Sequence, residues 1–408
     1  MKTDGGIVGN VVSKLGSISA PLPIKVPILD FARQYSQIRE EVLVALETVC
    51  DGQRFILGEE VREFEAAAAL ACRVGHGIGC ASGTDALWLA LAAAEIGPGH
   101  AVVTTPFSFF ATISSILRAG ALPVLADIDP QTYNLSPIAT ATLLRDPGTL
   151  PATARVRAIL PVHLYGQCAD WDAFSALQQE FDVCLIEDAA QAFGSQWQGR
   201  PAGGLGNLAA FSFYPTKNLS AYGDAGLVTT GDSALAERVA MLRTHGMRQR
   251  YHHDEVGWNS RLDTLQAAVL LVKLRHIDRW NQQRRELAQR YDHLFRSNGL
   301  AEPGLYPEHG IVLPYVDPRG VHVFHQYVIR ARRRDELRAF LAERGIGSEI
   351  YYPVPLHLQK ALHGLGYAAG DFPESERAAK EVLALPMFPE LTHPEQEQVV
   401  TAVASFMN

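Results

Sequence analysis

The sequence predicts an α/β protein built on a mostly parallel sheet that is flanked by helices. Short continuous apolar runs alternate with segments of helical periodicity from Ile28 onward, which is the pattern of strands buried on both faces. Polar and Gly-rich residues follow these runs, and ligands bind at that edge of open α/β sheets. The chain has 408 residues, which is long enough for a large domain and a smaller one.

The expected elements follow this alternation along the chain. Strands are expected over residues 77–82, 100–106, 121–129, 156–163, 182–188, 208–214 and 226–231. Helices are expected between and around them, over 37–50, 59–71, 84–95, 109–119 and 170–180. After Gly231 helices dominate, over 232–243, 262–296, 333–344, 374–384 and 393–406, with one strand at 322–330. These patterns predict a large domain over 26–265 and a smaller C-terminal α/β domain over 266–408. Residues 1–25 are expected to form a poorly ordered extension.

Composition excludes several classes of function. The net charge is −8 and no long basic run occurs, so capture of nucleic acid or an anionic membrane is not expected. The five cysteines form no CxxC pair, which argues against a disulfide framework or a zinc site. No apolar stretch reaches the roughly 20 residues of a membrane span, and residues 1–24 lack the apolar core of a signal peptide. We therefore expect a cytoplasmic protein.

The stretch "AFSFYPTKNLSAYGDAG" (210–226) leads from an apolar run into a loop of small and polar residues. It contains Lys217, which is the only lysine between Lys25 and Lys273. A residue that must lose a proton and attack a carbonyl has to be lysine, because arginine stays charged. On spacing alone, a leftover surface lysine is an equally good interpretation.

A second stretch, "IEDAAQAFG" (186–194), places Asp188 at the end of an expected strand. The plain interpretation is a cap for the next helix. The functional interpretation is an ionised aspartate that keeps a ring nitrogen protonated, as pyridoxal phosphate chemistry requires. Gln191 follows three residues later, which is the same side of a helical turn, and its amide could bond a ring oxygen.

Residues 80–91, "CASGTDALWLAL", predict a strand that runs into a helix through a turn of small residues. Glycine at Gly83 lets the backbone approach a ligand closely. The free N–H groups and positive dipole end of the helix make a natural phosphate site. A helix cap without any ligand is the alternative.

Two further stretches allow either packing or ligand contact. Aromatic residues at 107, 109 and 110 lie at a strand-to-helix turn in "TTPFSFFATI"; they could fill the core, or one could lie against a flat ring. Asn259 and Arg261 precede an amphipathic helix in "GWNSRLDTLQAAVL". They could cap this helix or reach an anion on another subunit.

Considered together, these stretches resemble the DegT/StrS family of sugar aminotransferases, which are fold-type I enzymes that depend on pyridoxal 5′-phosphate (PLP). The resemblance runs from about Val26 to the C-terminus. It rests on ten stretches in family order: "ILGEEVREFE", "ASGTDALWLAL", "TPFSFFAT", "GALPVLADID", "PVHLYGQ", "IEDAAQAFG", "AFSFYPTKNLSAYGDAG", "GWNSRLDTLQAAVL", "YYPVPLH" and "LPMFPEL".

The resemblance implies roles for the site residues of the chain. Lys217 looks like the lysine that forms the Schiff base with PLP and Asp188 like the partner of the pyridine nitrogen, while Gln191 would bond the ring hydroxyl. The phosphate would be bound by Gly83, Thr84 and Ser212.

The remaining roles concern the ring face and a second subunit. Phe110 sits where the family places an aromatic that stacks on the ring. Asn259 would reach the phosphate from the partner subunit, so that a homodimer shares its active sites. Arg261 is a candidate for substrate binding across the same interface.

The resemblance implies transfer of an amino group from L-glutamate to a keto-sugar carried on dTDP or UDP. "FYPTKNLSAYGD" looks like members that aminate C3, and Lys217 argues against the dehydratases that carry histidine there. The alternatives are a C4-specific aminotransferase, a non-catalytic regulator, or a fold-type I desulfurase or decarboxylase. Two departures from the family, "GPGHAV" (97–102) and Ala225 in "GDAG", affect loop geometry.

Overall fold

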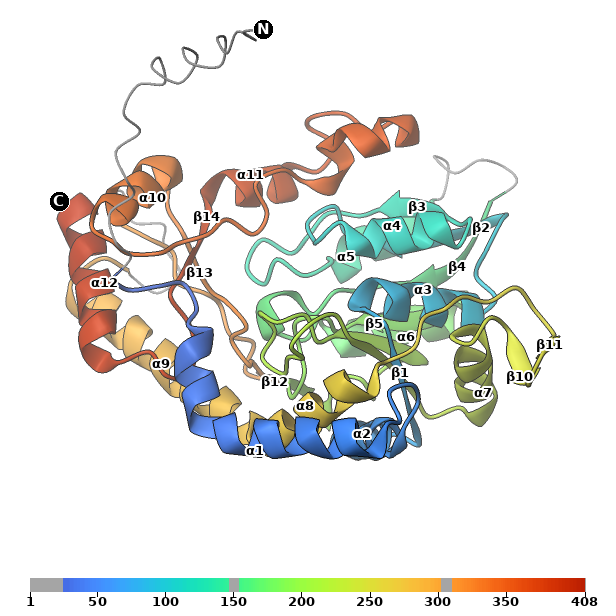
Figure 1. Ribbon diagram of the computed structural model, residues 1–408. Helices are drawn as coiled ribbons and strands as arrows, with labels where there is room; N and C mark the ends of the chain where they lie inside the picture. The colour runs from blue at the N-terminus through green and yellow to red at the C-terminus, as the bar shows by residue number, and fades with distance from the viewer. Residues whose placement is uncertain (1–24, 147–153, 302–309, 408) are drawn as a thin grey trace, which may run out of the picture.

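The central element of the fold is a seven-stranded sheet with the order β1-β9-β8-β5-β4-β2-β3 (Figure 1). The computed structural model describes residues 25–146, 154–301 and 310–407, so the extension predicted over 1–25 lies, but for Lys25, outside the described residues. The strands are β1 (His76–Cys80), β2 (His100–Thr104), β3 (Leu122–Leu125), β4 (Arg155–Ile159), β5 (Cys184–Asp188), β8 (Leu208–Ser212) and β9 (Gly226–Thr230). Strand β9 is antiparallel to β1 and β8, and the other neighbours are parallel. The predicted mostly parallel α/β sheet is confirmed.

Helices cover both faces of this sheet. The core on one face includes residues of α3 (Gly83–Ala93), α4 (Ala111–Arg118) and α7 (Ser233–Leu242). The core on the other face includes residues of α1 (Phe31–Gly52), α2 (Glu59–Ala71), α6 (Trp171–Phe181) and α8 (Thr264–Leu274). Alternate residues of one strand enter opposite cores: in β5, Leu185 packs on one face and Ile186 on the other. The strands therefore read as continuous apolar runs.

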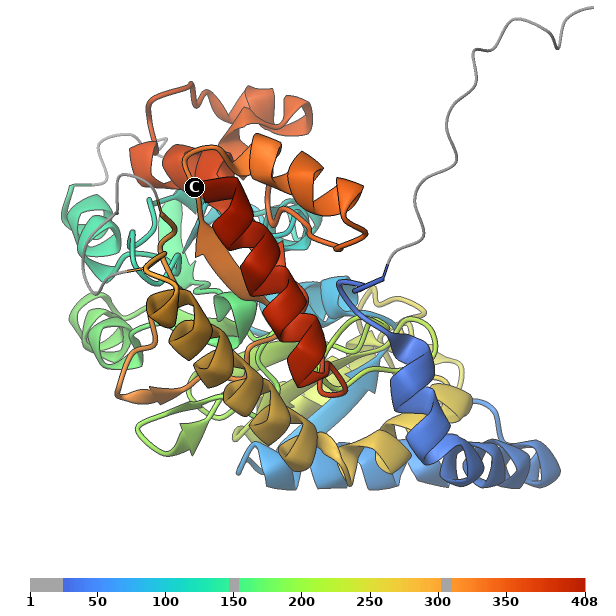
Figure 2. The same ribbon diagram turned by 90° about the vertical axis from the view of Figure 1, so that its left-hand side faces the viewer.

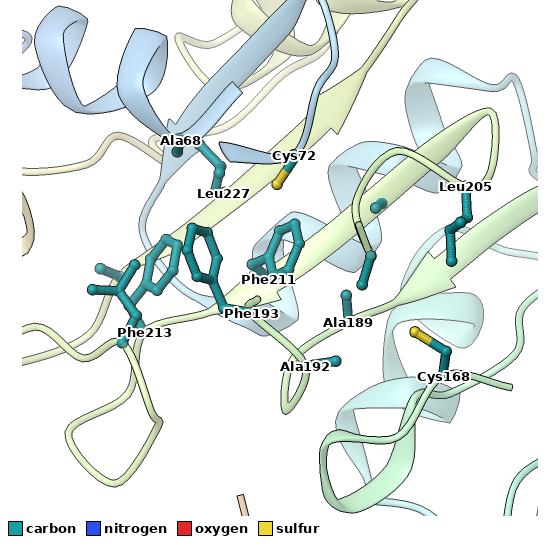
Figure 3. Close-up of a cluster of buried hydrophobic side chains, with 14 of the residues drawn as sticks. Ala68, Cys72, Cys168, Ala189, Ala192, Phe193, Leu205, Phe211, Phe213 and Leu227 are labelled. Atoms are coloured by element: carbon teal, nitrogen blue, oxygen red, sulfur yellow. The ribbon is translucent and has the colours of Figure 1, made fainter. Parts of the chain in front are cut away.

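An aromatic group anchors the strand that leads to Lys217 (Figure 3). Phe211 in β8 and Phe213 just beyond it are two residues apart and project to the same side. Phe193 contacts both rings, with centroid distances of 5.3 Å to Phe211 and 6.0 Å to Phe213. Because all three side chains are buried, they hold the end of β8 in place at the point where the lysine-bearing loop begins.

The C-terminal part packs around a second core (Figure 2). Its elements are α9 (Ile277–Ser297), β12 (Gly320–Val321), β13 (Tyr327–Arg330), α10 (Arg334–Glu343), α11 (Pro373–Glu381), β14 (Val382–Leu385) and α12 (His393–Met407). Strands β13 and β14 are antiparallel. The shorter elements elsewhere are α5 (Pro137–Arg145), β6 (Gln196–Trp197), β7 (Arg200–Pro201), β10 (Met247–Gln249) and β11 (His252–His253). In the part of the chain that the structure describes, every helix is too short or too polar to cross a membrane.

Two helix predictions differ from the structure. The helix expected over 262–296 is interrupted at Arg275 and His276, where α8 ends and α9 begins. The helix expected over 374–384 ends at Glu381, and the next four residues form β14. A short apolar run fits a helix or a strand equally well, and here the pairing with β13, more than 50 residues away in the sequence, decides for the strand.

Candidate active site

Lys217 lies in a closed loop that follows β8. The Lys217 N–H donates to Tyr214 O at 2.8 Å, and Ala221 N–H donates to Phe213 O at 2.8 Å, which closes the loop. The lysine side chain is partly buried. Burial lowers the pKa of Lys217 to about 8, while the negative charge of Asp188 acts in the opposite direction. A larger fraction of this amine is therefore neutral, and nucleophilic, than of an ordinary lysine.

Asp188 ends β5, next to the strand that carries the lysine loop. Its side chain is buried, and Oδ2 accepts a hydrogen bond from Thr112 Oγ1 at 2.8 Å while Oδ1 accepts one from Ala190 N at 3.2 Å. Burial raises the pKa of Asp188, and both hydrogen bonds and the charge of Lys217 oppose that shift. The carboxyl group is held in a fixed orientation, and a nearby cation would favour its ionised form.

Gln191 lies in a series of turns over residues 189–195, so the helical turn expected here is wrong. Its Oε1 accepts a hydrogen bond from Tyr165 N at 2.6 Å, and its Nε2 donates to Tyr352 Oη at 3.1 Å. The backbone N–H of Tyr165 can pair only with an acceptor, so it fixes which end of the amide faces Tyr352. The amide is thus preoriented as a donor on the Tyr352 side.

The structure brings together the three residues predicted to bind phosphate. Gly83 and Thr84 open helix α3, whose N-cap Ser82 accepts a hydrogen bond from Asp85 N at 3.1 Å. A Cβ atom on Gly83 would lie 2.5 Å from Ser212 Cβ. The end of β8 therefore touches the start of α3, where the first backbone N–H groups lack partners within the helix.

The aromatic residues at the β2–α4 turn face different surroundings. Phe110, predicted to stack on the cofactor ring, packs against a small cluster that includes Leu125 and Phe372. Phe109 is 59% exposed, and its ring centroid lies 6.2 Å from that of Tyr352. The buried Phe107 also contacts Tyr352, at 6.3 Å between ring centroids. Since Tyr352 bonds to Gln191, Phe109 is the exposed phenylalanine, and Phe107 the buried one, that contact this tyrosine.

Asn259 and Arg261 lie in the segment that precedes α8. Asn259 is exposed and its backbone pairs with Thr244. Between the two residues, Ser260 Oγ donates to Asp85 Oδ2 at 2.7 Å, which places the segment beside the first turn of α3. The Nε atom of Arg261 is buried without a hydrogen-bond partner among the described residues. Neither residue forms a hydrogen bond or ion pair with Lys217 or Asp188 within the described part of the chain.

Glu187 has a structural role that the sequence does not predict. Its carboxylate is fully buried and accepts hydrogen bonds of 2.7–2.8 Å from three backbone N–H groups in residues 203–206. The His163 ring lies 3.1 Å away through Nε2, and its Nδ1 accepts from Ala169 N. Glu187 thus holds a loop, while its neighbour Asp188 faces Lys217. Only alternation along the strand could have hinted that the two acids face different surroundings.

Thr112 and Tyr352 were also missed, because they contact Asp188 and Gln191 from distant parts of the chain. Among the described residues, no cluster of histidine, cysteine or acidic side chains could hold a metal ion.

The residues present match the chemical groups of PLP. Lys217 offers an amine for the aldehyde, Asp188 offers a carboxylate for the pyridine nitrogen, and Gln191 offers a donor for the ring hydroxyl. Two observations support the fit. The Asp188 carboxyl is buried with Lys217 as its nearby cation. A Cβ at position 83 would collide with Ser212, so the start of α3, with its free N–H groups, can lie against Ser212 only with a glycine there.

Three curated relatives are similar over nearly the whole chain. A "pleiotropic regulatory protein" of Geobacillus stearothermophilus is 48% identical, covering 94% of this chain and 99% of the relative. A dTDP-3-amino-3,4,6-trideoxy-alpha-D-glucose transaminase of Streptomyces venezuelae is 42% identical, covering 93% and 95%. A UDP-N-acetyl-3-dehydro-alpha-D-glucosamine 3-aminotransferase of Acidithiobacillus ferrooxidans is 40% identical, covering 93% and 97%.

Solved structures and a family comparison agree with these relatives. DesV of S. venezuelae superposes with a TM-score of 0.88 at 41% identity, covering 95% of this chain and 99% of DesV. NtdA of Bacillus subtilis, solved with bound cofactor PMP, gives 0.84 at 29% identity, covering 94% and 85%. The sequence model of the DegT/DnrJ/EryC1/StrS aminotransferase family matches residues 36–404. The chain therefore belongs to the DegT/DnrJ/EryC1/StrS aminotransferase family.

Proposed function

We propose that this protein is a PLP-dependent aminotransferase that moves an amino group from L-glutamate to the C3 ketone of a sugar carried on dTDP or UDP. The observation that carries the proposal is that Asp188 lies within electrostatic range of both Lys217 and Tyr352, the tyrosine that Gln191 contacts, on a sheet where β8 also reaches Gly83. Two relatives, at 42% and 40% identity, are transaminases of 3-amino sugars on dTDP and UDP. PMP, the aminated form of PLP, is the cofactor named for NtdA.

When bound, PLP supplies an electron sink for the bonding pair that a departing proton leaves behind. Lys217 Nζ would hold the cofactor through its aldehyde. As a neutral amine beside the cofactor, Nζ would also be the base for the α-proton of the amino donor. Burial suits Nζ to this task, because its pKa of about 8 lets it take up and release a proton near neutral pH.

The other site residues would orient the cofactor and stabilise its charge. The fixed carboxylate of Asp188 would favour a protonated ring nitrogen and balance its positive charge. The donor end of Gln191, whose orientation is set by Tyr165 N, would bond the ring hydroxyl. Gly83, Thr84 and Ser212 would bind the phosphate at the start of α3.

A second copy of the chain completes the site in this proposal. Asn259 reaches the phosphate of the partner subunit, and Arg261 binds substrate across the interface. The exposure of Asn259 leaves its side chain free to contact another chain. The buried Nε of Arg261 has no hydrogen-bond partner among the described residues, which supports the proposal.

The direct test is the absorption spectrum of the PLP-loaded protein before and after addition of L-glutamate. We expect glutamate to convert the spectrum from the PLP form to the PMP form. Lys217→Ala should lose both the covalent cofactor spectrum and turnover, whereas the exposed Lys380→Ala should behave as wild type. Near wild-type turnover in Lys217→Ala would contradict the assignment of Lys217 as the lysine that binds the cofactor.

Product analysis then settles the substrate. The PMP form is mixed with nucleotide-linked 3-keto and 4-keto sugars, and mass spectrometry with NMR identifies the position of the new amine. Amination of only 4-keto sugars would favour the C4-specific alternative.

One observation favours a second candidate function, a non-catalytic regulator: the relative at 48% identity is named a regulatory protein. A regulator without catalysis would leave the cofactor spectrum unchanged with every amino donor. The retention of Lys217 and Asp188 makes this the weaker candidate.

A further inference from the structure

A second lysine, Lys273 in α8, is buried beneath the loop that carries Lys217. Its side chain is 2% exposed. Nζ donates to Ser220 Oγ at 2.9 Å and lies 4.5 Å from the centroid of the Tyr222 ring. Among the described residues no carboxylate pairs with it, and burial lowers the pKa of Lys273 to about 8.

Packing alone does not explain this lysine. The buried neighbours of Lys273 on α8 include Leu270 and Val272, and an apolar side chain would fill the same position without burying an amine that lacks a counter-ion. Groups that a fold retains at such a cost are concentrated at functional sites. The only hydrogen bond that Lys273 Nζ makes within the described chain is to Ser220, three residues after Lys217.

Helix α8 holds this loop at two points. Gln266 lies seven residues before Lys273, which is two helical turns and the same helix face. Gln266 Oε1 accepts a hydrogen bond from Tyr222 N at 2.8 Å. The side chains of Gln266 and Lys273 therefore hydrogen-bond to the loop on both sides of Ala221. The Ala221 N–H itself closes the loop.

Asn218 anchors the part of the loop that directly follows Lys217. Its Nδ2 donates to Asn281 Oδ1 at 2.8 Å and to Val323 O at 3.0 Å, and its Oδ1 lies 3.2 Å from His325 Nδ1. Lys217 thus lies between an anchored Asn218 on one side and the exposed residues Tyr214 and Thr216 on the other. The polar contacts of Asn218, Ser220 and Tyr222 therefore add to the core packing of Leu219 and Ala221 in holding this loop.

We propose that Lys273 is a positioning residue for the aminotransferase reaction: by holding Ser220 Oγ it fixes the loop, so that the Lys217 amine returns to the same place after each displacement. This inference rests on the proposed function. The reaction requires Lys217 Nζ to leave the cofactor, move a proton and later attack again. A base that is misplaced by about 1 Å can cost up to a hundredfold in rate.

The test is a double-mutant cycle between Lys273 and Ser220. Lys273→Met keeps an unbranched chain of similar length but removes the donor, and Ser220→Ala removes the acceptor. Each single variant, loaded with PLP, is compared with the double variant in the single-turnover rate with L-glutamate. Lys273→Arg is the conservative rescue, and Lys380→Met on the exposed face of α11 is the matched control.

We expect each single variant to lower the maximal single-turnover rate about tenfold or more, while the glutamate concentration for half-maximal rate changes less than about twofold. The double variant should be no slower than the slower single variant, because both remove the same hydrogen bond. Lys273→Arg should recover part of the rate, and Lys380→Met should match wild type.

A second measurement does not depend on the cofactor or on turnover. Hydrogen–deuterium exchange of the cofactor-free chain should be faster over residues 214–222 in Lys273→Met and Ser220→Ala than in wild type. Wild-type rates in both single variants, losses that add in the double variant, or unchanged exchange over 214–222 would each overturn the proposal. If wild type itself does not respond to glutamate, the proposed function fails, and the exchange measurement still decides whether Lys273 holds the loop.

Discussion

At the scale of single residues, burial disfavours charge on both Lys217 and Asp188. It lowers the pKa of the amine and raises that of the carboxyl, and their mutual attraction opposes both shifts. A bound pyridinium would give the carboxylate a second cation, which allows the amine to be neutral without leaving the acid unpaired. The pair is therefore suited to a cofactor that is itself charged.

This pair predicts a pH dependence for cofactor uptake. The neutral amine attacks the aldehyde, so the rate at which the cofactor-free chain takes up PLP should rise through a midpoint near pH 8, the pKa of Lys217. Stopped-flow absorbance measures this rate. Lys217→Ala, which cannot form the link, is the control, and a midpoint near the usual lysine value of 10.5 would contradict the prediction.

The lowered pKa of Lys217 also predicts how the free energy of unfolding changes with pH. Between about pH 8 and 10.5 the unfolded chain holds a proton on Lys217 that the folded chain has lost. The unfolded state binds more protons there, so the contribution of Lys217 to the free energy of unfolding rises with pH across this window. Urea titrations of the cofactor-free wild type and Lys217→Met should differ in this direction, and a parallel pH dependence of the two proteins would contradict it.

Thr112 provides a test of the role of Asp188. Thr112→Val keeps the shape of the side chain but removes the hydrogen bond to Asp188 Oδ2, so the ionised carboxylate becomes less favourable. Hydrogen bonds to charged groups contribute about 1.5–3 kcal/mol, and we expect the single-turnover rate with glutamate to fall about ten- to a hundredfold. Thr140→Val, at a buried threonine bonded to Ser136 O, should leave the rate unchanged.

Substitutions at Phe109 and Phe110 distinguish a residue that contacts the cofactor ring from a residue that packs in the protein. We expect Phe109→Ala to weaken PLP binding up to about tenfold, the size of an aromatic stacking contribution. Phe110→Ala should mainly lower the melting temperature, because its ring packs with Leu125 and Phe372. Fluorescence titration and thermal unfolding measure the two effects, and the reverse pattern would restore Phe110 as the stacking residue.

At the scale of elements, the site depends on a close contact between the end of β8 and the start of α3. Each element is ordinary by itself. Their approach at Gly83 and Ser212 places the free N–H groups of a helix start beside a strand that leads to Lys217.

Gly83→Ala tests this contact. Its new Cβ would lie 2.5 Å from Ser212 Cβ, so α3 and β8 must separate, and the phosphate should lose close contact with the helix start. We expect PLP affinity to fall at least about tenfold, measured by equilibrium titration. Gly52→Ala, where a Cβ meets no atom within 4 Å, is the control; equal affinities in both variants would contradict the proposed phosphate site.

At the scale of the whole molecule, the proposed site needs two chains. Asn259 and Arg261 flank Ser260, which bonds to the first turn of α3, and among the described residues neither bonds to Lys217 or Asp188. In the proposed dimer they would act on the partner's cofactor. A shared site can be tested by complementation.

Lys217→Ala and Asn259→Ala should each be nearly inactive as homodimers. When equal amounts are mixed and allowed to exchange subunits, half of the dimers are mixed and each contains one intact site, so about a quarter of wild-type activity should return. Activity assays after mixing check this, with each variant incubated alone as the control. No recovery, despite subunit exchange shown by mass spectrometry, would mean that Asn259 acts within its own chain.

Much of the fold could be predicted because local patterns and tertiary context agree there. The strands of the sheet are apolar runs between helical segments, and Lys217 is marked by the absence of other lysines over more than 200 residues. Predictions failed where context overrode pattern. The run Val382–Leu385 became a strand because β13 pairs with it. Gln191 lies in turns closed by backbone bonds from Ala192 to Ala189 and from Ser195 to Ala192, while Tyr165 and Tyr352 hold its side chain.

The sequence by itself determined the α/β class and the family, and it pointed to the lysine and aspartate of the proposed site, because each rests on short stretches of the chain. Only the tertiary structure decided which phenylalanines contact Tyr352, what orients Gln191 and Asp188, and that Lys273 bonds to the lysine loop. The side-chain bonds of Gln191 to Tyr352, of Thr112 to Asp188 and of Lys273 to Ser220 join residues that are 53 to 161 positions apart in the sequence. Periodicity carries no information over such distances, and only packing brings these residues together.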